Sequence, residues 1–260
     1  MTGLRERWSA GETAFGGWCT TGSPFVAEVI GSQGFDYVCV DLQHGLSDLE
    51  QEWMLVQALR GTGATPVVRV PFNSTPWPGK ALDAGAEAVI VPMVNSRAEA
   101  ELAAAACRYP PLGVRSYGPV RAGMLLGSDP PAVNAKVVCL VMIETTRAVE
   151  SADEICSTPG VDGVYIGPAD LSVSMSGSLS AMGSKEHADA LETVRLACER
   201  HGIIPGLHTS GGAQARHFAD LRFKMCTLGT DAALLAATLR AELEKAKGPG
   251  GSSEAGGIYG

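Results

Sequence analysis

The sequence lacks the features that would place the protein in a membrane or on nucleic acid. No apolar run approaches the roughly 18 residues that a membrane-spanning helix needs, and residues 1–16 hold no apolar signal segment. The formal net charge is −8, and the Lys and Arg residues form no block. We therefore expect a cytoplasmic protein with no membrane or nucleic-acid partner, in which a local Arg or metal ion could still attract a small anionic substrate.

The cysteines show no metal-binding pattern. The chain has seven, but no two form a Cys-x-x-Cys pair, and several lie in apolar runs such as Tyr37-Val38-Cys39-Val40. Free cysteine is among the residue types that are buried most often. We expect reduced cysteines in the core and no structural zinc site.

What the chain does have is a large apolar fraction in a regular order. Hydrophobic residues make up 45% of its 260 residues and charged residues only 18%, a balance that supports a large core. Eight runs rich in Val, Ile or aromatic residues alternate with helical stretches, which predicts a parallel sheet. Eight such repeats favour closure into a single-domain α/β fold, the (β/α)8 TIM barrel. The expected strands are residues 14–19, 36–41, 66–70, 88–91, 137–143, 161–166, 203–207 and 224–228.

The other segments are assigned by composition. We expect the barrel domain to span residues 1–247, and the Gly- and Ser-rich residues 248–260 to form a disordered tail. Residues 109–131 are rich in Pro and Gly and are expected to form a long loop. Residues 184–200 are expected to form an amphipathic helix with His187 facing solvent.

Two carboxylates follow predicted strands at their carboxyl ends, where barrels of this kind place their chemistry. Glu144 directly follows the fifth strand, and Asp170 lies in a Gly-Pro turn after the sixth. Two carboxylates without a Cys or His ligand set suit a hard divalent ion such as Mg²⁺ or Mn²⁺. The alternative is structural, with Glu144 in a salt bridge and Asp170 capping a helix.

Basic side chains occupy the same end of the predicted barrel. His44 follows the second strand and is the candidate base, with Asp83 as a possible orienting acid, although a histidine at such a position is by itself more often a structural loop residue. Arg69 lies in the apolar third strand, so we expect a carboxylate partner from either the protein or the substrate. His208, after the seventh strand, remains ambiguous between these roles.

These residues belong to a series of motifs that occur in the order of a known family. The series is Gly34-Phe35-Asp36-Tyr37, Asp41-Leu42-Gln43-His44-Gly45, Val67-Val68-Arg69-Val70-Pro71, Asp83-Ala84-Gly85-Ala86, Val91-Pro92-Met93-Val94, residues 108–115, Ile143-Glu144-Thr145 and residues 160–171. On these motifs the chain resembles the HpcH/HpaI aldolases, the metal-dependent class II pyruvate aldolases, from about residue 15 to residue 237.

The resemblance implies a role for each matching residue. Glu144 and Asp170 would bind the divalent metal ion, Mg²⁺, Mn²⁺ or Co²⁺, and His44, oriented by Asp83, would serve the acid/base step through water. Arg69 would hold the enolate oxygen or the aldehyde carbonyl, and backbone amides around residues 167–170 would receive the substrate carboxylate. Family members are commonly hexameric, so a homo-oligomer, trimer or hexamer, is expected. The residues expected to bind substrate are Trp18, Arg69, Gly167, Pro168, Ala169 and Leu207.

Two positions depart from the family pattern. Many members carry Gln where this chain has Met142, and many read Asp-Gly-Glu-His where it reads Asp41-Leu42-Gln43-His44. These changes leave the metal ligands intact but affect the groups beside the metal and the base. Residues 174–183 are also longer and looser than the family pattern.

We therefore expect a carbon–carbon lyase acting on small molecules. The leading hypothesis is an aldolase that cleaves 4-hydroxy-2-keto acids to a pyruvate-type 2-keto acid and an aldehyde, or runs in reverse. A second is related enolate chemistry on the same barrel: an oxaloacetate-type decarboxylase, a biosynthetic condensing enzyme, or a lyase of CoA esters, for which no basic patch is present. A third is a barrel kept for binding after losing catalysis, which the intact set Glu144, Asp170, Arg69 and His44 argues against.

Overall fold

Eight parallel strands close into a barrel in which each strand pairs with its neighbours in chain order and β8 returns to β1. The structure is a computed structural model that describes residues 3–248. The predicted (β/α)8 fold and its eight strands are confirmed. The strands are β1 (Ala14–Cys19), β2 (Tyr37–Asp41), β3 (Thr65–Arg69), β4 (Ala88–Val91), β5 (Val138–Ile143), β6 (Gly163–Ile166), β7 (Ile204–Leu207) and β8 (Met225–Thr230).

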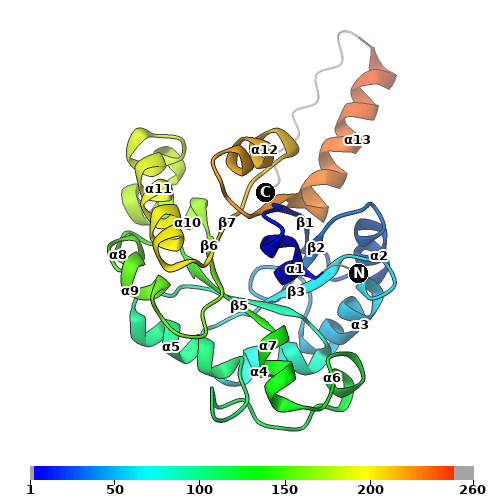
Figure 1. Cartoon of the computed structure of the whole chain (residues 1–260). Coiled ribbons are helices and arrows are strands. Elements are labelled where there is room, and N and C mark those ends of the chain that lie inside the picture. The colour runs from blue at the N-terminus through cyan, green and yellow to red at the C-terminus, as the bar shows by residue number, and fades with distance from the viewer. Residues whose placement is uncertain (1–2, 249–260) are drawn as a thin grey trace.

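Helices surround the barrel (Figure 1). Several begin at side chains that accept a hydrogen bond from the first turn, as Asp48 does for α3 and Ser184 for α11. The helices are α1 (Leu4–Ser9), α2 (Pro24–Gly31), α3 (Leu49–Leu59), α4 (Pro76–Ala84), α5 (Arg97–Ala106), α6 (Val120–Leu125), α7 (Pro130–Lys136), α8 (Thr146–Glu150), α9 (Ala152–Cys156), α10 (Pro168–Ser176), the 3-10 turn η1 (Leu179–Ala181), α11 (Lys185–His201), α12 (Gly212–Asp220) and α13 (Asp231–Lys247).

The apolar residues form two layers, as a closed parallel sheet requires. One layer fills the barrel and includes the buried rings of Trp18, Tyr37 and Tyr165. The other lies between the sheet and the helices. All seven cysteines are free and buried, which confirms their predicted place in the core.

Helix α1 packs at the amino ends of the strands. The Trp8 indole donates to the carbonyl of Lys224, directly before β8, at 2.9 Å, and Arg5 donates to the carbonyl of Val137, directly before β5, at 2.7 Å. Both contacts lie at the end of the barrel opposite to the carboxyl ends of the strands.

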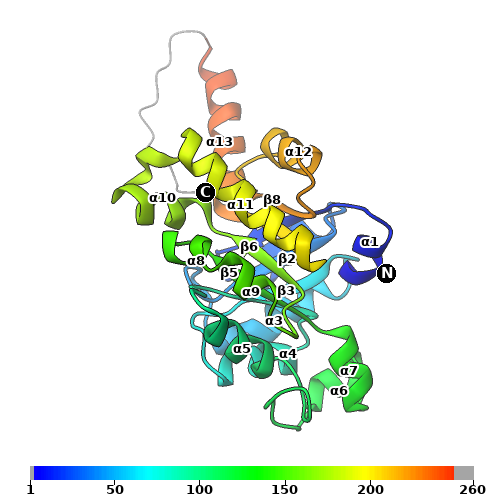
Figure 2. The same ribbon diagram turned by 60° about the vertical axis from the view of Figure 1, so that its left-hand side comes forward.

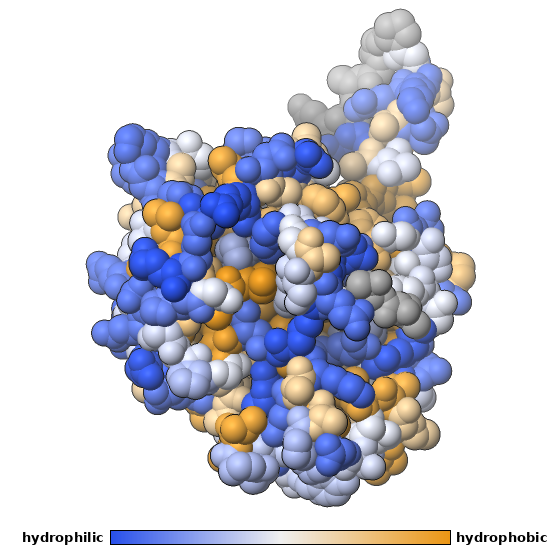
Figure 3. Space-filling view, in the orientation of Figure 1, coloured by the Kyte–Doolittle hydropathy of each residue, from blue (hydrophilic) through white to orange (hydrophobic). Residues whose placement is uncertain are grey.

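Helix α13 extends away from the rest of the chain (Figures 1 and 2). Apolar side chains gather at its base (Figure 3) and continue along it: Leu235 is 58% exposed and Leu239 60%. Across residues 3–248, no helix is long and apolar enough to cross a membrane.

Two expectations about local structure are wrong. Residues 109–131 are not one loop, since they contain α6 and the start of α7, whose first turn is capped by Asp129 with Pro130 at its first position. His187 does not face solvent: it is 3% exposed, and its Nε2 lies 2.9 Å from the carbonyl oxygen of Pro168. Packing of α11 against the start of α10 turns this histidine inward. The expected tail lies outside the described residues except for Gly248.

Candidate active site

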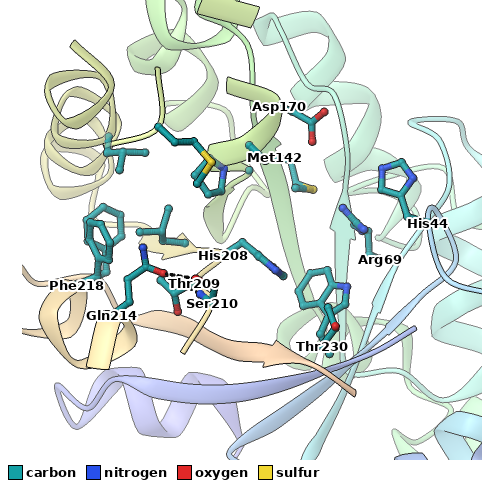
Figure 4. Close-up of a pocket in the computed structure, with 18 of the residues that line it drawn as sticks. His44, Arg69, Met142, Asp170, His208, Thr209, Ser210, Gln214, Phe218 and Thr230 are labelled. Carbon is teal, nitrogen blue, oxygen red and sulfur yellow. Dashed lines mark hydrogen bonds between the residues drawn. The ribbon is translucent and has the colours of Figure 1, made fainter. Parts of the chain in front are cut away.

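A cavity of about 780 Å³ opens at the carboxyl ends of the strands (Figure 4). It brings together most of the residues selected from the sequence, because parallel strands deliver their last residues to one end of the barrel. Apolar side chains from α11 and α12 extend it on one side. The predicted site residues that line it are Trp18, His44, Arg69, Gly167, Pro168, Ala169, Asp170 and Leu207, and Asp41, Met142 and His208 line it as well.

Arg69 has a carboxylate partner within the protein. Asp41 and Arg69 end neighbouring strands in register, and the guanidinium donates from Nε to Oδ1 at 2.9 Å and from Nη2 to Oδ2 at 2.6 Å. The Trp18 indole also donates to Asp41 at 3.2 Å, and its ring lies 5.1 Å from the guanidinium carbon. The third guanidinium nitrogen, Nη1, has no protein partner within residues 3–248 and remains available for a ligand.

The ion pair keeps both groups charged although both are buried. Burial opposes the charge of Asp41, but the hydrogen bonds and charge of Arg69 hold the pKa of this carboxyl below its usual range. Burial likewise acts to lower the pKa of Arg69, and Asp41 raises it above its usual value. The backbone N–H groups of Gln43 and His44 also donate to Asp41, which fixes the loop that carries His44.

Glu144 is a buried carboxylate without a cationic partner. It is 2% exposed, and its Oε1 accepts a 2.6 Å hydrogen bond from the backbone of Met93. Burial raises its pKa to about 7, and the charge of Asp170 acts in the same direction. The predicted structural alternatives are absent from the described chain: no ion pair involves Glu144, and the N-cap of α10 is Gly167 rather than Asp170.

Gly167 leaves room for the Glu144 carboxylate. A Cβ at this glycine would lie 2.7 Å from Oε2 of Glu144, so any other residue would displace the carboxylate. Asp170 stands in the first turn of α10 at the edge of the same cavity. Within the described chain no three His, Cys, Asp or Glu side chains gather as a metal site. The charge of Asp170 acts on Glu144, and two neighbouring carboxylates of this kind fit a hard cation whose other ligands are water and substrate oxygens.

Asp83 does not meet His44 within one chain. It lies in the last turn of α4, where it accepts a 2.6 Å hydrogen bond from Arg115. Helix α4 leads into the amino end of β4, whereas His44 follows the carboxyl end of β2, so the two side chains belong to opposite ends of the barrel. Orientation of His44 by Asp83 stays a prediction, and it requires a second chain.

Sequence reasoning missed three groups that shape the site. Met93 supplies the backbone donor to Glu144 from a positive φ of 56°, which is uncommon for a residue with a side chain. Tyr165 stacks on Trp18 with ring centroids 5.4 Å apart, and its hydroxyl contacts Thr227. Tyr165 and Thr227 sit in apolar strand segments, so only their alternation toward the barrel interior could have indicated them.

Fold and site together define a barrel enzyme with a carboxylate pair and an ion-paired arginine at the catalytic end. The chain belongs to the HpcH/HpaI aldolase/citrate lyase family, whose model matches residues 15–238. It is therefore a carbon–carbon lyase, as predicted.

Individual relatives are similar over nearly the whole chain. The hydroxypyruvate/pyruvate aldolase of Rhizorhabdus wittichii is 36% identical over 249 residues, which cover 95% of this chain and 99% of that protein. The crystal structure of an HpcH/HpaI aldolase/citrate lyase family protein from Burkholderia cenocepacia J2315 superposes with a TM-score of 0.87 at 27% identity, covering 95% of this chain and 100% of the other. The crystal structure of the citrate synthase SbnG superposes with a TM-score of 0.86 at 26% identity, covering 95% and 98%.

Proposed function

We propose that the chain cleaves 4-hydroxy-2-keto acids into a pyruvate-type 2-keto acid and an aldehyde, or joins them in reverse, with a divalent metal ion as cofactor. One observation carries the proposal: Glu144, a buried carboxylate without a cationic partner within residues 3–248, lies against Gly167 in the wall of the cavity that Asp170 and Arg69 line, and Arg69 keeps a free donor. The relative named hydroxypyruvate/pyruvate aldolase supports this class of substrate.

Glu144 and Asp170 would hold the metal ion, with Mg²⁺, Mn²⁺ and Co²⁺ as candidates. When bound, the ion would supply Lewis acidity that stabilises negative charge on the enolate of the 2-keto acid. Its charge would also offset the cost of keeping Glu144 ionised in a buried position.

The chain's own groups would bind and orient the substrate. The N-terminus of α10 would receive the substrate carboxylate through the backbone N–H groups of Ala169 and Asp170, and Leu207 would contact its carbon chain. Arg69 would donate from Nη1 to the enolate oxygen or the aldehyde carbonyl, with Asp41 and Trp18 fixing its plane. His44, exposed at the mouth of the cavity, would exchange protons with the substrate through water.

We also propose that the active form is a homo-oligomer, a trimer or hexamer. The leucines along the projecting α13 are exposed in a single chain, and burying them against another copy is favourable. An oligomer would also offer His44 an Asp83 from a second copy, which the single chain does not supply.

A substrate panel tests the proposed function. Pyruvate and hydroxypyruvate should each be combined with several aldehydes in the presence of Mg²⁺, Mn²⁺ or Co²⁺, and the products identified by mass spectrometry. We expect 4-hydroxy-2-keto acids only with a metal ion. Decarboxylation of oxaloacetate without any aldol product would favour the decarboxylase instead, and no reaction in any combination would contradict both.

A further inference from the structure

A line of hydroxyl groups runs through the barrel interior to the cavity. The Tyr37 hydroxyl lies 2.9 Å from Oγ1 of Thr227, and Oγ1 in turn contacts the hydroxyl of Tyr165. The Tyr165 hydroxyl lies 3.5 Å from Nδ1 of His208, at the end of β7. Both tyrosines and Thr227 are fully buried.

Which hydroxyl donates and which accepts at each contact follows from giving every hydroxyl proton an acceptor. Within the described chain the Tyr37 hydroxyl has Oγ1 of Thr227 as its main partner and a weaker interaction with the Tyr165 hydroxyl, and we assign it as the donor to Oγ1. If Thr227 then donates to Tyr165 and Tyr165 donates to Nδ1 of His208, every hydroxyl proton has an acceptor. The reverse order leaves the Tyr37 proton only the weaker interaction with Tyr165, and a poorly paired buried donor is costly.

This direction fixes the tautomer of His208. Its Nδ1 accepts a hydrogen bond, so the ring proton of the neutral imidazole is on Nε2. Burial and the positive charge of Arg69 lower the pKa of His208 to about 4, while Asp41 opposes the shift. The ring is therefore neutral at physiological pH.

The His208 ring borders the reactive part of the cavity. It meets the Trp18 ring edge-on at 4.9 Å, and the Trp18 ring in turn lies beside the guanidinium of Arg69. Figure 4 shows the His208 side chain directed toward the side of the cavity that holds Arg69. Nε2 has no protein partner within residues 3–248, and the thioether of Met142 in the same cavity cannot donate a hydrogen bond.

We propose that His208 is a further catalytic residue, a neutral hydrogen-bond donor from Nε2 to the carbonyl oxygen of the acceptor aldehyde, with Tyr165 as the positioning residue. This role rests on the proposed function. Arg69 would then be free to hold the enolate oxygen.

The step balances without proton loss from His208. The enolate carbon attacks the aldehyde carbon, a carbon–carbon bond forms, and the π pair of the aldehyde C=O moves onto its oxygen. The Nε2–H hydrogen bond strengthens as negative charge develops there. The proton that converts this oxygen into the 4-hydroxyl group comes from water served by His44. In the cleavage direction the same proton leaves by the same route.

The tautomer is tested first, by nitrogen NMR of protein with ¹⁵N-labelled histidine, with His208 assigned from the spectrum of His208→Gln. We expect a neutral ring protonated on Nε2 at pH 7 in the wild type. Tyr165→Phe removes the donor to Nδ1, so the ring should then populate both tautomers. A wild-type ring protonated on Nδ1, or a Tyr165→Phe spectrum identical to wild type, would overturn the proposal.

The catalytic role is tested by separating two half-reactions. Exchange of the pyruvate methyl protons in D₂O with Mn²⁺ requires enolate formation but no aldehyde, whereas aldol formation requires both. We expect His208→Leu to lower kcat/KM for aldol formation by about 10²-fold and to leave proton exchange unchanged. His208→Gln, which restores an N–H donor, should recover part of the loss, and His201→Gln at the end of α11 serves as the matched control.

The two proposals fail in different ways. Aldol formation at the wild-type rate in His208→Leu, with proton exchange intact, would overturn the role of His208 alone. A wild-type protein that exchanges no pyruvate protons with any metal would overturn the proposed function and this role with it.

Discussion

Asp41 and Arg69 occupy register-matched positions on β2 and β3, and their side chains meet in a two-bond ion pair at the floor of the cavity. A planar guanidinium is needed for this geometry, because Nε and Nη2 must both reach one carboxylate while Nη1 stays free. The pairing of β2 with β3 therefore determines how Nη1 of Arg69 is presented to the substrate.

Arg69→Lys should therefore impair catalysis although it keeps the charge. An ammonium group cannot hold the carboxylate through two bonds and still offer a third donor in a fixed direction. We expect turnover in the aldol assay to fall by about 10²–10³-fold. Arg60→Lys, at an arginine that bridges Glu87 and Gly85 away from the cavity, is the control. Near-wild-type turnover in Arg69→Lys would assign Arg69 a purely structural role.

Removal of Asp41 should affect the stability of the fold. Asp41→Ala leaves the buried Arg69 charge without its partner, and breaking a buried pair in this way costs about 3–5 kcal/mol. Denaturant unfolding followed by circular dichroism measures the change. A variant as stable as the wild type would show that the cavity hydrates Arg69 well enough to replace the carboxylate.

Much of this arrangement could be predicted from the sequence. The apolar runs identified all eight strands, and the carboxyl ends of those strands identified Glu144, Asp170 and Arg69. In a parallel barrel these ends lie on one side irrespective of the sequence of the connecting helices and loops. The pairing of Arg69 with Asp41 was not predicted, since it depends on the register between two strands rather than on either strand alone.

Contacts across the barrel or between distant loops could not be predicted either. Tyr165 and Thr227 are 62 positions apart and meet only because β6 and β8 face one interior. The two hydrogen bonds between Asn134 and the backbone of Tyr109 hold α7 against a Pro- and Gly-rich segment whose composition alone indicates a loop. His187 shows the same limit, because its inward direction is set by the carbonyl of Pro168 on another element.

Glu52 should make the stability of the protein depend on pH. It is 1% exposed on α3, its Oε1 has no hydrogen-bond partner, and burial raises its pKa from 4.5 to about 7, with Lys80 opposing the shift. The folded state binds the carboxyl proton of Glu52 more tightly than the unfolded state does. Protonated Glu52 therefore contributes fully to the free energy of unfolding below about pH 4.5, and this contribution is lost as the pH rises through 7.

The comparison that isolates this effect is Glu52→Gln against wild type in thermal unfolding from pH 4 to pH 8. As the pH rises over that range, the free energy of unfolding of Glu52→Gln should increase by up to about 3 kcal/mol relative to that of the wild type. Glu50→Gln, on the exposed side of the same helix, should run parallel to wild type. If the stability of Glu52→Gln also changed with pH in the same way as that of the wild type, Glu52 would be ionised in the folded protein.

His44 and Asp83 should act as one unit contributed by two chains. Each single variant, His44→Ala and Asp83→Asn, should lower turnover by about 10²–10⁴-fold, and the double variant should be little worse. Mixed oligomers of the two single variants should regain activity, because some sites would then combine an intact His44 with an intact Asp83. Mixtures no more active than their components would remove the pair from the mechanism.

The account depends most on enolate formation at the Glu144 and Asp170 carboxylates. The direct measurement is deuterium exchange into the methyl group of pyruvate, followed by proton NMR, with and without a chelator. We predict metal-dependent exchange in the wild type and in the surface control Glu150→Gln, and none in the chelated protein, in Glu144→Gln or in Asp170→Asn, although both variants remain folded. Exchange that survives the chelator, or a pyruvate adduct trapped on a lysine by borohydride, would contradict the account.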